Sequence, residues 1–264
     1  MHVVIRGDGP PVFFIHGSAT DHGTWTIQLA QLRNSVRCVA WDRRGTGQSP
    51  LPEGCDYLTV EEHADDAAAL LREHGGGKPR VVVGQSFGGV VALDLARRYP
   101  ELVGSAVLME PPLAASDSVP PIPEHFLARY DELQRTEGGP AAAEFFLRSV
   151  LGDEAWERIP GPYRERSRAL WRPIRQDIAA LGAYAVRYAA LRRVERPVLL
   201  LGGDRSADFY RPTLEALERS LGNARRETLS GAGHMMHADV FRKFNARLLE
   251  WLEAQGELPP GSAG

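Results

Sequence analysis

Ser86 is the residue of this sequence best placed for chemistry, since it lies between two glycines in the segment Gly-Gln-Ser-Phe-Gly at 84–88. Three valines at 81–83 precede the segment, and an apolar, alanine-containing helical pattern follows it. This order of strand, tight turn and helix holds a serine in a strained conformation with its hydroxyl clear of the sheet. The turn also points the Phe87 N–H, at the helix start, toward an oxyanion formed beside Ser86. A glycine-rich turn without chemistry is the alternative, but the flanking strand and helix favour a nucleophile.

The elements around this turn alternate between strands and helices over most of the chain. Apolar or β-branched runs predict further strands at 3–6, 12–15, 36–41, 105–109 and 197–202. A short strand is also expected near 226–229. Between two of them, the capping box formed by Thr59 and Glu62 places the start of a helix at Thr59. From about 113 to 193 the pattern is mainly helical, and from 258 onward we expect disorder. The alternation predicts an α/β protein with an inserted helical region.

Composition narrows the function classes. A chain of 264 residues with 43% hydrophobic content can bury a large core as one domain, with room for an insertion. The net charge of −3 gives no bias toward nucleic acid or an anionic membrane. No stretch approaches the roughly 20 apolar residues that span a bilayer, and the N-terminus lacks a signal-peptide pattern. Two cysteines do not suggest a disulfide framework, and we expect a reduced, cytoplasmic location.

Four segments, in order along the chain, resemble the α/β-hydrolase superfamily. His16-Gly17 looks like its oxyanion loop, and Asp-Arg-Arg-Gly-Thr-Gly-Gln-Ser at 42–49 is similar to its Asp-x-Arg-Gly-x-Gly-x-Ser segment. Residues 84–88 match its nucleophile elbow. Gly-Ala-Gly-His at 231–234 resembles its histidine loop. The resemblance covers nearly all of the chain except the middle insertion.

The resemblance implies an α/β-hydrolase fold with a mostly parallel central sheet flanked by helices. Residues 1–112 and 194–264 would form the core, and 113–193 an inserted helical cap over the carboxyl edge of the strands. Ligands bind at that edge in open α/β sheets.

The resemblance also implies that Ser86 is the nucleophile and His234 the base that takes its proton. His237 is the only competitor for the base on the same loop, and His22 could still line the pocket. We expect His16 to have a structural hydrogen-bonding role. Asp42 and Arg44 are expected to brace the loops by ion pairing and capping.

The acid of the triad is where the sequence departs from the common pattern. Most relatives carry it after the strand that corresponds to 198–201, but here Ser206 occupies that place. Glu110 ends the strand after the elbow helix, a position that some members use, and the order Ser, Glu, His is the usual one. We therefore favour Glu110, with Asp204 in reserve and Asp208 as a weaker third. The alternative for Glu110 is a polar strand end at the turn into the cap.

The predicted chemistry is acyl transfer. Backbone N–H groups of Phe87 and Ser18 would stabilise the oxyanion. Epoxide hydrolases and haloalkane dehalogenases of the superfamily use aspartate at the elbow, so Ser86 argues against both and favours attack on an ester, lactone, thioester or activated amide. No metal-ligand cluster or dinucleotide fingerprint is apparent in the sequence, so no cofactor and no metal are expected.

The cap gives only weak indications of the substrate. Its aromatic residues could line an apolar acyl pocket, although plain packing is favoured. The eight arginines against two acids at 161–193 could attract an anionic substrate or an acyl carrier, but a solvated face is favoured. The leading interpretation is a carboxylester-type serine hydrolase acting on a small-molecule acyl substrate. A biosynthetic thioesterase or cyclase, a C–C bond hydrolase and a non-hydrolytic ligand-binding protein are the alternatives.

Overall fold

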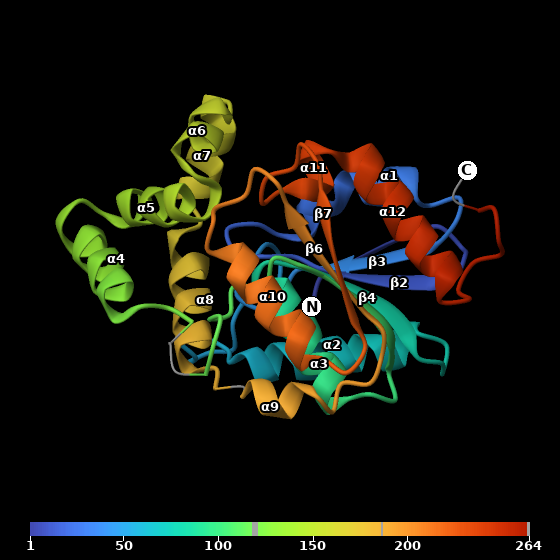
Figure 1. Cartoon of the computed structure of the whole chain (residues 1–264). Coiled ribbons are helices and arrows are strands. Elements are labelled where there is room, and N and C mark those ends of the chain that lie inside the picture. Colours follow the sequence, from blue (N-terminus) through green and yellow to red (C-terminus); the bar gives the residue numbers. More distant parts are fainter. Residues whose placement is uncertain (118–120, 186, 263–264) are drawn as a thin grey trace.

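The computed structural model describes residues 1–117, 121–185 and 187–262 (Figure 1). Its seven strands form one sheet in the order β1-β3-β2-β4-β5-β6-β7. Only β1 runs antiparallel to its neighbour, so the expectation of a mostly parallel sheet is confirmed. The strands are β1 (Val3–Arg6), β2 (Pro11–Ile15), β3 (Arg37–Trp41), β4 (Arg80–Gln85), β5 (Val103–Met109), β6 (Val198–Gly203) and β7 (Ala224–Leu229).

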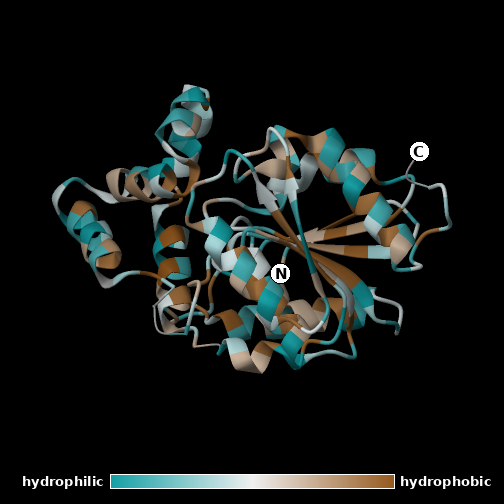
Figure 2. Ribbon diagram, in the orientation of Figure 1, coloured by the Kyte–Doolittle hydropathy of each residue, from teal (hydrophilic) through white to brown (hydrophobic). Residues whose placement is uncertain are grey.

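Helices cover both faces of the sheet, as Figure 1 shows. One face packs on α2 (Val60–His74), α3 (Phe87–Arg98) and α10 (Tyr210–Ser220). The other packs on the short helix η1 (His22–Trp25) and on α1 (Thr26–Gln31), α11 (Met236–Asp239) and α12 (Phe241–Ala254). Because side chains alternate along a strand, Phe13 joins the first core and Phe14 the second. Burial on both faces explains why the inner strands β2, β4, β5 and β6 are mainly apolar, whereas the edge strand β7 is mostly polar (Figure 2).

The helix predicted from the capping box begins where the sequence indicates. Thr59 is the N-cap of α2: its hydroxyl accepts from the Glu62 N–H at 3.1 Å. The Glu62 carboxylate in turn accepts from the Thr59 N–H at 2.8 Å. Both predicted hydrogen bonds are therefore present.

The insertion between β5 and β6 is helical, as expected. It contains α4 (Glu124–Thr136), α5 (Gly139–Leu151), α6 (Asp153–Arg158), α7 (Gly161–Arg168), α8 (Trp171–Ala183) and α9 (Tyr188–Leu191). In Figure 1, α4 to α7 extend to one side of the sheet, and α8 lies between them and the core. The insertion has its own buried cluster, which includes Tyr130, Phe146, Trp156 and Ile174. We keep the name cap for this insertion; its limits at 113 and 193 stay a prediction.

The C-terminal segment differs in part from the expectation of disorder from 258 onward. Leu258 is 7% exposed and packs into the same core as α12, so the prediction is wrong for this residue. An apolar side chain at the end of a chain is ordered when a core surface is available to it. Residues 263–264 lie outside the described part of the chain. None of the described helices has the length and hydrophobicity that crossing a bilayer requires.

Candidate active site

The carboxyl edge of the sheet brings the predicted site residues together. Ser86 follows β4, and Glu110 follows β5. Asp204 follows β6, and His234 lies in the loop after β7. Because these four strands are parallel neighbours, their following residues meet at one edge.

Ser86 has the strained backbone that the elbow requires, with φ 52° and ψ −122°. A Cβ on Gly84 would lie 2.3 Å from the Gly88 oxygen, and one on Gly88 2.3 Å from the Ile15 oxygen, so neither position tolerates a side chain. Among the described residues, three non-glycine residues have positive φ: Ala19, Ser86 and Glu110. Two of them are predicted catalytic residues and the third adjoins the predicted oxyanion donor Ser18. Such strain tends to concentrate at functional sites.

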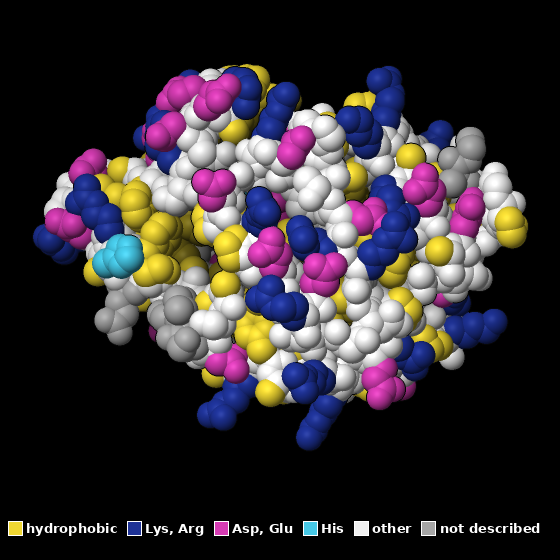
Figure 3. Space-filling model, in the orientation of Figure 1, with side chains coloured by type: hydrophobic (Ala, Val, Ile, Leu, Met, Phe, Trp, Pro, Cys, Tyr) yellow, Lys and Arg dark blue, Asp and Glu magenta, His cyan; other side chains and the backbone are white. Residues whose placement is uncertain are grey.

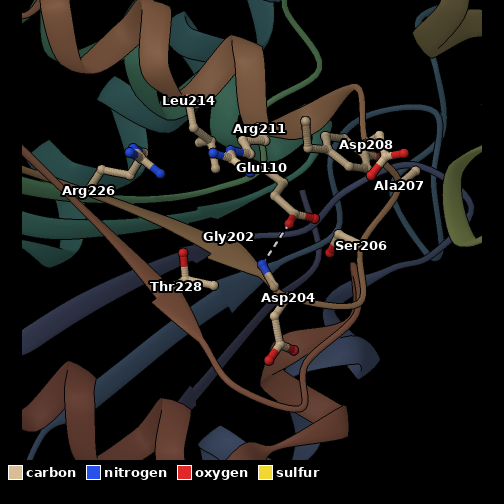
Figure 4. Close-up of a pocket in the computed structure, with 12 residues that line it drawn as sticks. Glu110, Gly202, Asp204, Ser206, Ala207, Asp208, Arg211, Leu214, Arg226 and Thr228 are labelled. Atoms are coloured by element: carbon tan, nitrogen blue, oxygen red, sulfur yellow. Dashed lines mark hydrogen bonds between the residues drawn. The ribbon is translucent and has the colours of Figure 1, made fainter.

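His234 and Glu110 form a buried pair. Nδ1 of His234 lies 2.7 Å from Oε2 of Glu110, and both side chains are at most 4% exposed. The other carboxylate oxygen accepts from the Gly203 N–H at 2.8 Å, the contact drawn in Figure 4. Since the Nδ1–H is directed at the carboxylate, the lone pair of the imidazole lies on Nε2. A general base needs this tautomer.

The reserve acids lie elsewhere. Asp204 is exposed, and its Oδ1 accepts from the Gly231 N–H at 2.7 Å. In Figure 4 its carboxylate points away from Glu110. Asp208 is also exposed. The structure therefore brings Glu110, and neither aspartate, to His234.

Nε2 of His234 faces two further donors that the sequence did not indicate. The side-chain amide of Gln85 lies 3.2 Å from it, and the Tyr210 hydroxyl lies 3.3 Å away. The Tyr210 ring also stacks on the imidazole, with 4.5 Å between centroids. Burial, followed by the Glu110 carboxylate, raises the pKa of Tyr210 well above its ordinary value, so its hydroxyl stays protonated.

Within the described part of the chain, Ser86 Oγ makes no hydrogen bond to His234. Catalytic hydrogen bonds often form only once substrate is bound. Proton transfer from Ser86 therefore requires that the hydrogen bond from the Gln85 amide to Nε2 of His234 break first.

The predicted oxyanion donors flank Ser86. Phe87 is the first residue of α3, so its N–H has no partner within the helix. Ser18 lines the same cavity as Ser86. His16, expected to be structural, accepts from the Arg43 N–H with Nε2 at 3.1 Å and contacts the Gly17 oxygen with Nδ1 at 2.8 Å. Burial, with the Arg43 charge, lowers the pKa of His16 to about 3, so the ring is neutral.

An apolar cavity of about 590 Å³ opens beside Ser86 and lies between the core and the cap. Figure 3 shows hydrophobic side chains around a hollow beside the cap, at the left of the view. Phe126, Phe146 and Val150 line the cavity from the cap, and Leu181, Phe209 and Tyr210 from the side of the core and α8. No charged side chain belongs to its described lining. Its volume is typical of small-molecule sites, which span about 300–1,000 Å³.

A second, polar cavity of about 380 Å³ reaches the far side of Glu110 (Figure 4). Asp204, Arg211 and Arg226 contribute charged side chains to it, and Tyr210 separates it from the apolar cavity. Ser206, which stands where most relatives carry the acid, lines it with an unpartnered, buried hydroxyl.

Asp42 and Arg44 make the loop-bracing contacts that the sequence predicts. Asp42 accepts from the backbone N–H groups of His22 and Gln48 at 2.9 and 2.8 Å, and these bonds hold the pKa of Asp42 low although burial opposes them. Arg44 forms a two-bond ion pair with Asp66. His22 lies 2.6 Å from Asp42 and is not part of the lining of the apolar cavity.

His237, the competing base, is fully buried. Its Nε2 contacts the Thr24 hydroxyl at 2.8 Å, and its ring packs on Trp25. Burial lowers the pKa of His237 to about 3. These contacts fit a core residue.

One group of described residues has side-chain atoms spaced as metal ligands, within 4.8 Å of one another: His2, His22 and Asp42. The sequence did not indicate it, because the three residues are far apart in the chain. The Asp42 carboxylate already accepts two backbone N–H groups and contacts the His22 ring, so a loop-bracing role accounts for its contacts.

The cap arginines do not gather at the apolar cavity. Four of them form ion pairs with acidic side chains: Arg164, Arg166, Arg168 and Arg175. Arg172 lies over the Trp171 ring. The favoured interpretation of a solvated face agrees with these contacts.

Sequence reasoning missed Arg43, which is 1% exposed and forms a two-bond ion pair with Asp177 of α8 at 2.9 and 2.8 Å. The signal available in the sequence was Asp177 itself, a single acid among Ile174, Ile178 and Leu181 on an otherwise apolar helix face. A charge at such a position predicts a buried partner.

Several known proteins are similar to this chain. LipV of Mycobacterium tuberculosis, named a lipase, is 37% identical over 140 residues, or 52% of each sequence. RutD of Cronobacter turicensis is 27% identical over 95% of this chain and 93% of its own. The structure of a thermophilic esterase from Thermogutta terrifontis, solved with malate bound, matches with a TM-score of 0.77 and 25% identity, covering 96% of this chain and 93% of that one. The matched stretch spans only 41% of the hydrolase YraK of Bacillus subtilis and 52% of LipV.

The family comparison covers most of the chain. The model of the alpha/beta hydrolase family matches residues 12–247, from β2 to α12. This range includes the elbow, the cap and the histidine loop. The protein belongs to the alpha/beta hydrolase family.

Proposed function

We propose that this hydrolase cleaves an ester-type acyl bond through an acyl-enzyme, with Ser86 as nucleophile, His234 as base and Glu110 as acid. The observation that carries the proposal is the buried His234–Glu110 pair, whose 2.7 Å contact at Nδ1 directs Nε2 and its lone pair to the side of the elbow. The strained backbone of Ser86 and the apolar cavity that it lines add support. Relatives named esterase and lipase also support this class of bond.

In the proposed mechanism, Ser86 Oγ attacks the acyl carbon while its proton passes to Nε2 of His234. Glu110 stabilises the imidazolium that forms. The backbone N–H groups of Phe87 and Ser18 stabilise the oxyanion, and one such donor typically contributes about 2.7–4 kcal/mol. The imidazolium then protonates the leaving group as its bond to the acyl carbon breaks. Water attacks the Ser86 ester by the same proton route, releasing the carboxylic acid and restoring the serine.

The cavity supports an uncharged acyl group of medium size. Burying a carboxylate against an apolar wall without a partner is costly, and the described lining offers no cationic side chain. Ser149 and Thr213 also line the cavity, but their hydroxyls already donate to backbone carbonyls. An acyl carrier finds no support in the paired cap arginines.

A substrate panel tests the proposal. We expect the wild type to hydrolyse p-nitrophenyl acetate, butanoate and octanoate, and Ser86→Ala to lose this activity by several orders of magnitude. Matched thioesters and β-diketones in the same panel separate the thioesterase and C–C hydrolase alternatives. Binding of these compounds without turnover by the wild type would favour a ligand-binding protein and contradict the proposal.

A further inference from the structure

The buried Arg43 side chain has a partner for each of its five N–H groups. Two groups bond the Asp177 carboxylate, at 2.9 and 2.8 Å. A third donates to the His16 oxygen at 3.3 Å and a fourth to the Gly17 oxygen at 3.1 Å. The fifth faces Nε2 of His63 at 3.4 Å. With every donor used, the guanidinium is fixed in position and orientation.

One of these bonds fixes the peptide that carries a predicted oxyanion donor. The Gly17 oxygen and the Ser18 N–H belong to the same peptide unit, and in a trans peptide they point in opposite directions. No cis peptide occurs in the described chain. Arg43 and the His16 ring, whose Nδ1 lies 2.8 Å away, both hold the Gly17 oxygen. The Ser18 N–H is therefore directed away from Arg43.

This peptide adjoins the nucleophile. A Cβ placed on Gly17 would lie 3.0 Å from the Cβ of Ser86. Arg43 also lies over the ring of Phe87, 4.3 Å from its centroid, and Phe87 carries the other predicted oxyanion donor. A single side chain thus contacts Phe87 and the oxygen of the peptide that carries the Ser18 N–H.

The charge that balances Arg43 comes from the cap. Asp177 is 3% exposed and lies on α8, 134 residues away from Arg43 along the chain. Removing one partner of a buried ion pair leaves an uncompensated charge, which strongly destabilises a protein. The position of α8 and the position of the Arg43 guanidinium are consequently coupled.

We propose that the Arg43–Asp177 pair is a positioning device that fixes the Gly17–Ser18 peptide, so that the oxyanion hole is complete only while α8 is docked on the core. This inference rests on the proposed function and extends it by giving the cap a role in transition-state stabilisation. Neither residue touches the reacting atoms. Both act through the orientation of the Ser18 N–H.

The test variant is Arg43→Met/Asp177→Leu, which removes both charges together, so that no unpaired ion is left behind. We expect kcat for p-nitrophenyl acetate to fall about 100-fold, as for the loss of one oxyanion donor, with KM changed less than about threefold. Affinity for a trifluoromethyl ketone, which forms a tetrahedral oxyanion adduct with the serine, should fall by a similar factor. Amide hydrogen exchange in residues 16–20 should become faster.

Arg44→Met is the matched control, because it breaks the neighbouring ion pair with Asp66 without touching the Gly17 oxygen. We expect kcat within about threefold of wild type for this control. A double variant that melts like the wild type and keeps its kcat, inhibitor affinity and exchange rates would overturn the proposal.

If the double variant does not fold, Asp177→Glu serves in its place, because it keeps the negative charge of the buried pair. Its longer side chain shifts the carboxylate and the guanidinium, and we expect at least a tenfold loss of kcat at unchanged KM; wild-type kcat would overturn the proposal. If the wild type hydrolyses no ester, the proposed function fails instead. The exchange comparison still decides whether the pair holds the loop, because it does not depend on activity.

Discussion

Replacing Glu110 by glutamine removes one acceptor from a site that needs two. The carboxylate accepts the Nδ1–H of His234 at 2.7 Å with one oxygen and the Gly203 N–H at 2.8 Å with the other. An amide has the same shape, but it offers one oxygen and one NH2 group. Whichever way it faces, one of the two N–H donors meets another donor.

The two orientations of the amide have different consequences. If its oxygen stays on the Gly203 N–H, its NH2 group faces Nδ1 of His234, and the proton must move to Nε2. That tautomer cannot accept the Ser86 proton. If the oxygen stays on His234, the Gly203 N–H is left buried without a partner, at a cost of about 1–3 kcal/mol. In either case, the negative charge that stabilises the imidazolium is lost.

We therefore expect Glu110→Gln to lower kcat for p-nitrophenyl butanoate by about 10³–10⁴-fold, equivalent to roughly 4–5.5 kcal/mol of transition-state stabilisation. The variant should stay folded, because the substitution is isosteric and costs at most the roughly 1–3 kcal/mol of one unpaired buried N–H. Asp204→Asn is the matched control: its amide oxygen can still accept from the Gly231 N–H, and kcat should stay within about threefold. A large loss in Asp204→Asn, with Glu110→Gln active, would move the acid to β6 and refute this reasoning.

Three further outcomes follow from the same contacts. Val150→Trp should shorten the apolar cavity and lower kcat/KM for the octanoate ester at least tenfold relative to the acetate, and an unchanged chain-length profile would contradict the proposed acyl site. The pKa values of His16 and His237 lie at about 3, below those of unfolded histidine, so their contribution to stability is complete above about pH 6.5 and is lost as pH falls toward 3. Urea unfolding at pH 7 and 5.5 should show a total loss of about 1 kcal/mol for each histidine between the two pH values, with a smaller loss in His237→Gln, and pH-independent stability would contradict these assignments. Thr59→Ala should lower the free energy of unfolding by about 1 kcal/mol in the same assay while leaving kcat unchanged, whereas an unaltered free energy would mean that the capping box contributes nothing.

Local patterns predicted much of this fold. The valine run before Ser86, the glycines beside it and the capping box at Thr59 each act over a few residues, and the structure has all three. Chain order, the end of a strand and the resemblance to the superfamily together favoured Glu110 over Asp204. The positive φ of Glu110 was not predicted from the sequence.

Local sequence patterns could not predict the contacts between distant segments. Arg43 and Asp177 are 134 residues apart, and no spacing rule connects them. Gln85 and Tyr210 meet at Nε2 of His234 because three separate strand ends converge there. Two prolines follow Leu258, so the sequence predicts a disordered tail there. Its burial depends on the core surface beside α12. These features depend on tertiary packing, which a local reading of one sequence does not reach.

The most direct test of the central claim is covalent labelling of the intact wild type with a fluorophosphonate, followed by peptide mass spectrometry. This reagent traps a serine only when a base activates it. We expect the adduct on Ser86, a great slowing of labelling in His234→Ala and no adduct in Ser86→Ala. A wild type that stays unlabelled, or that carries the adduct on a different residue, would contradict the assignment of Ser86 as a nucleophile activated by His234.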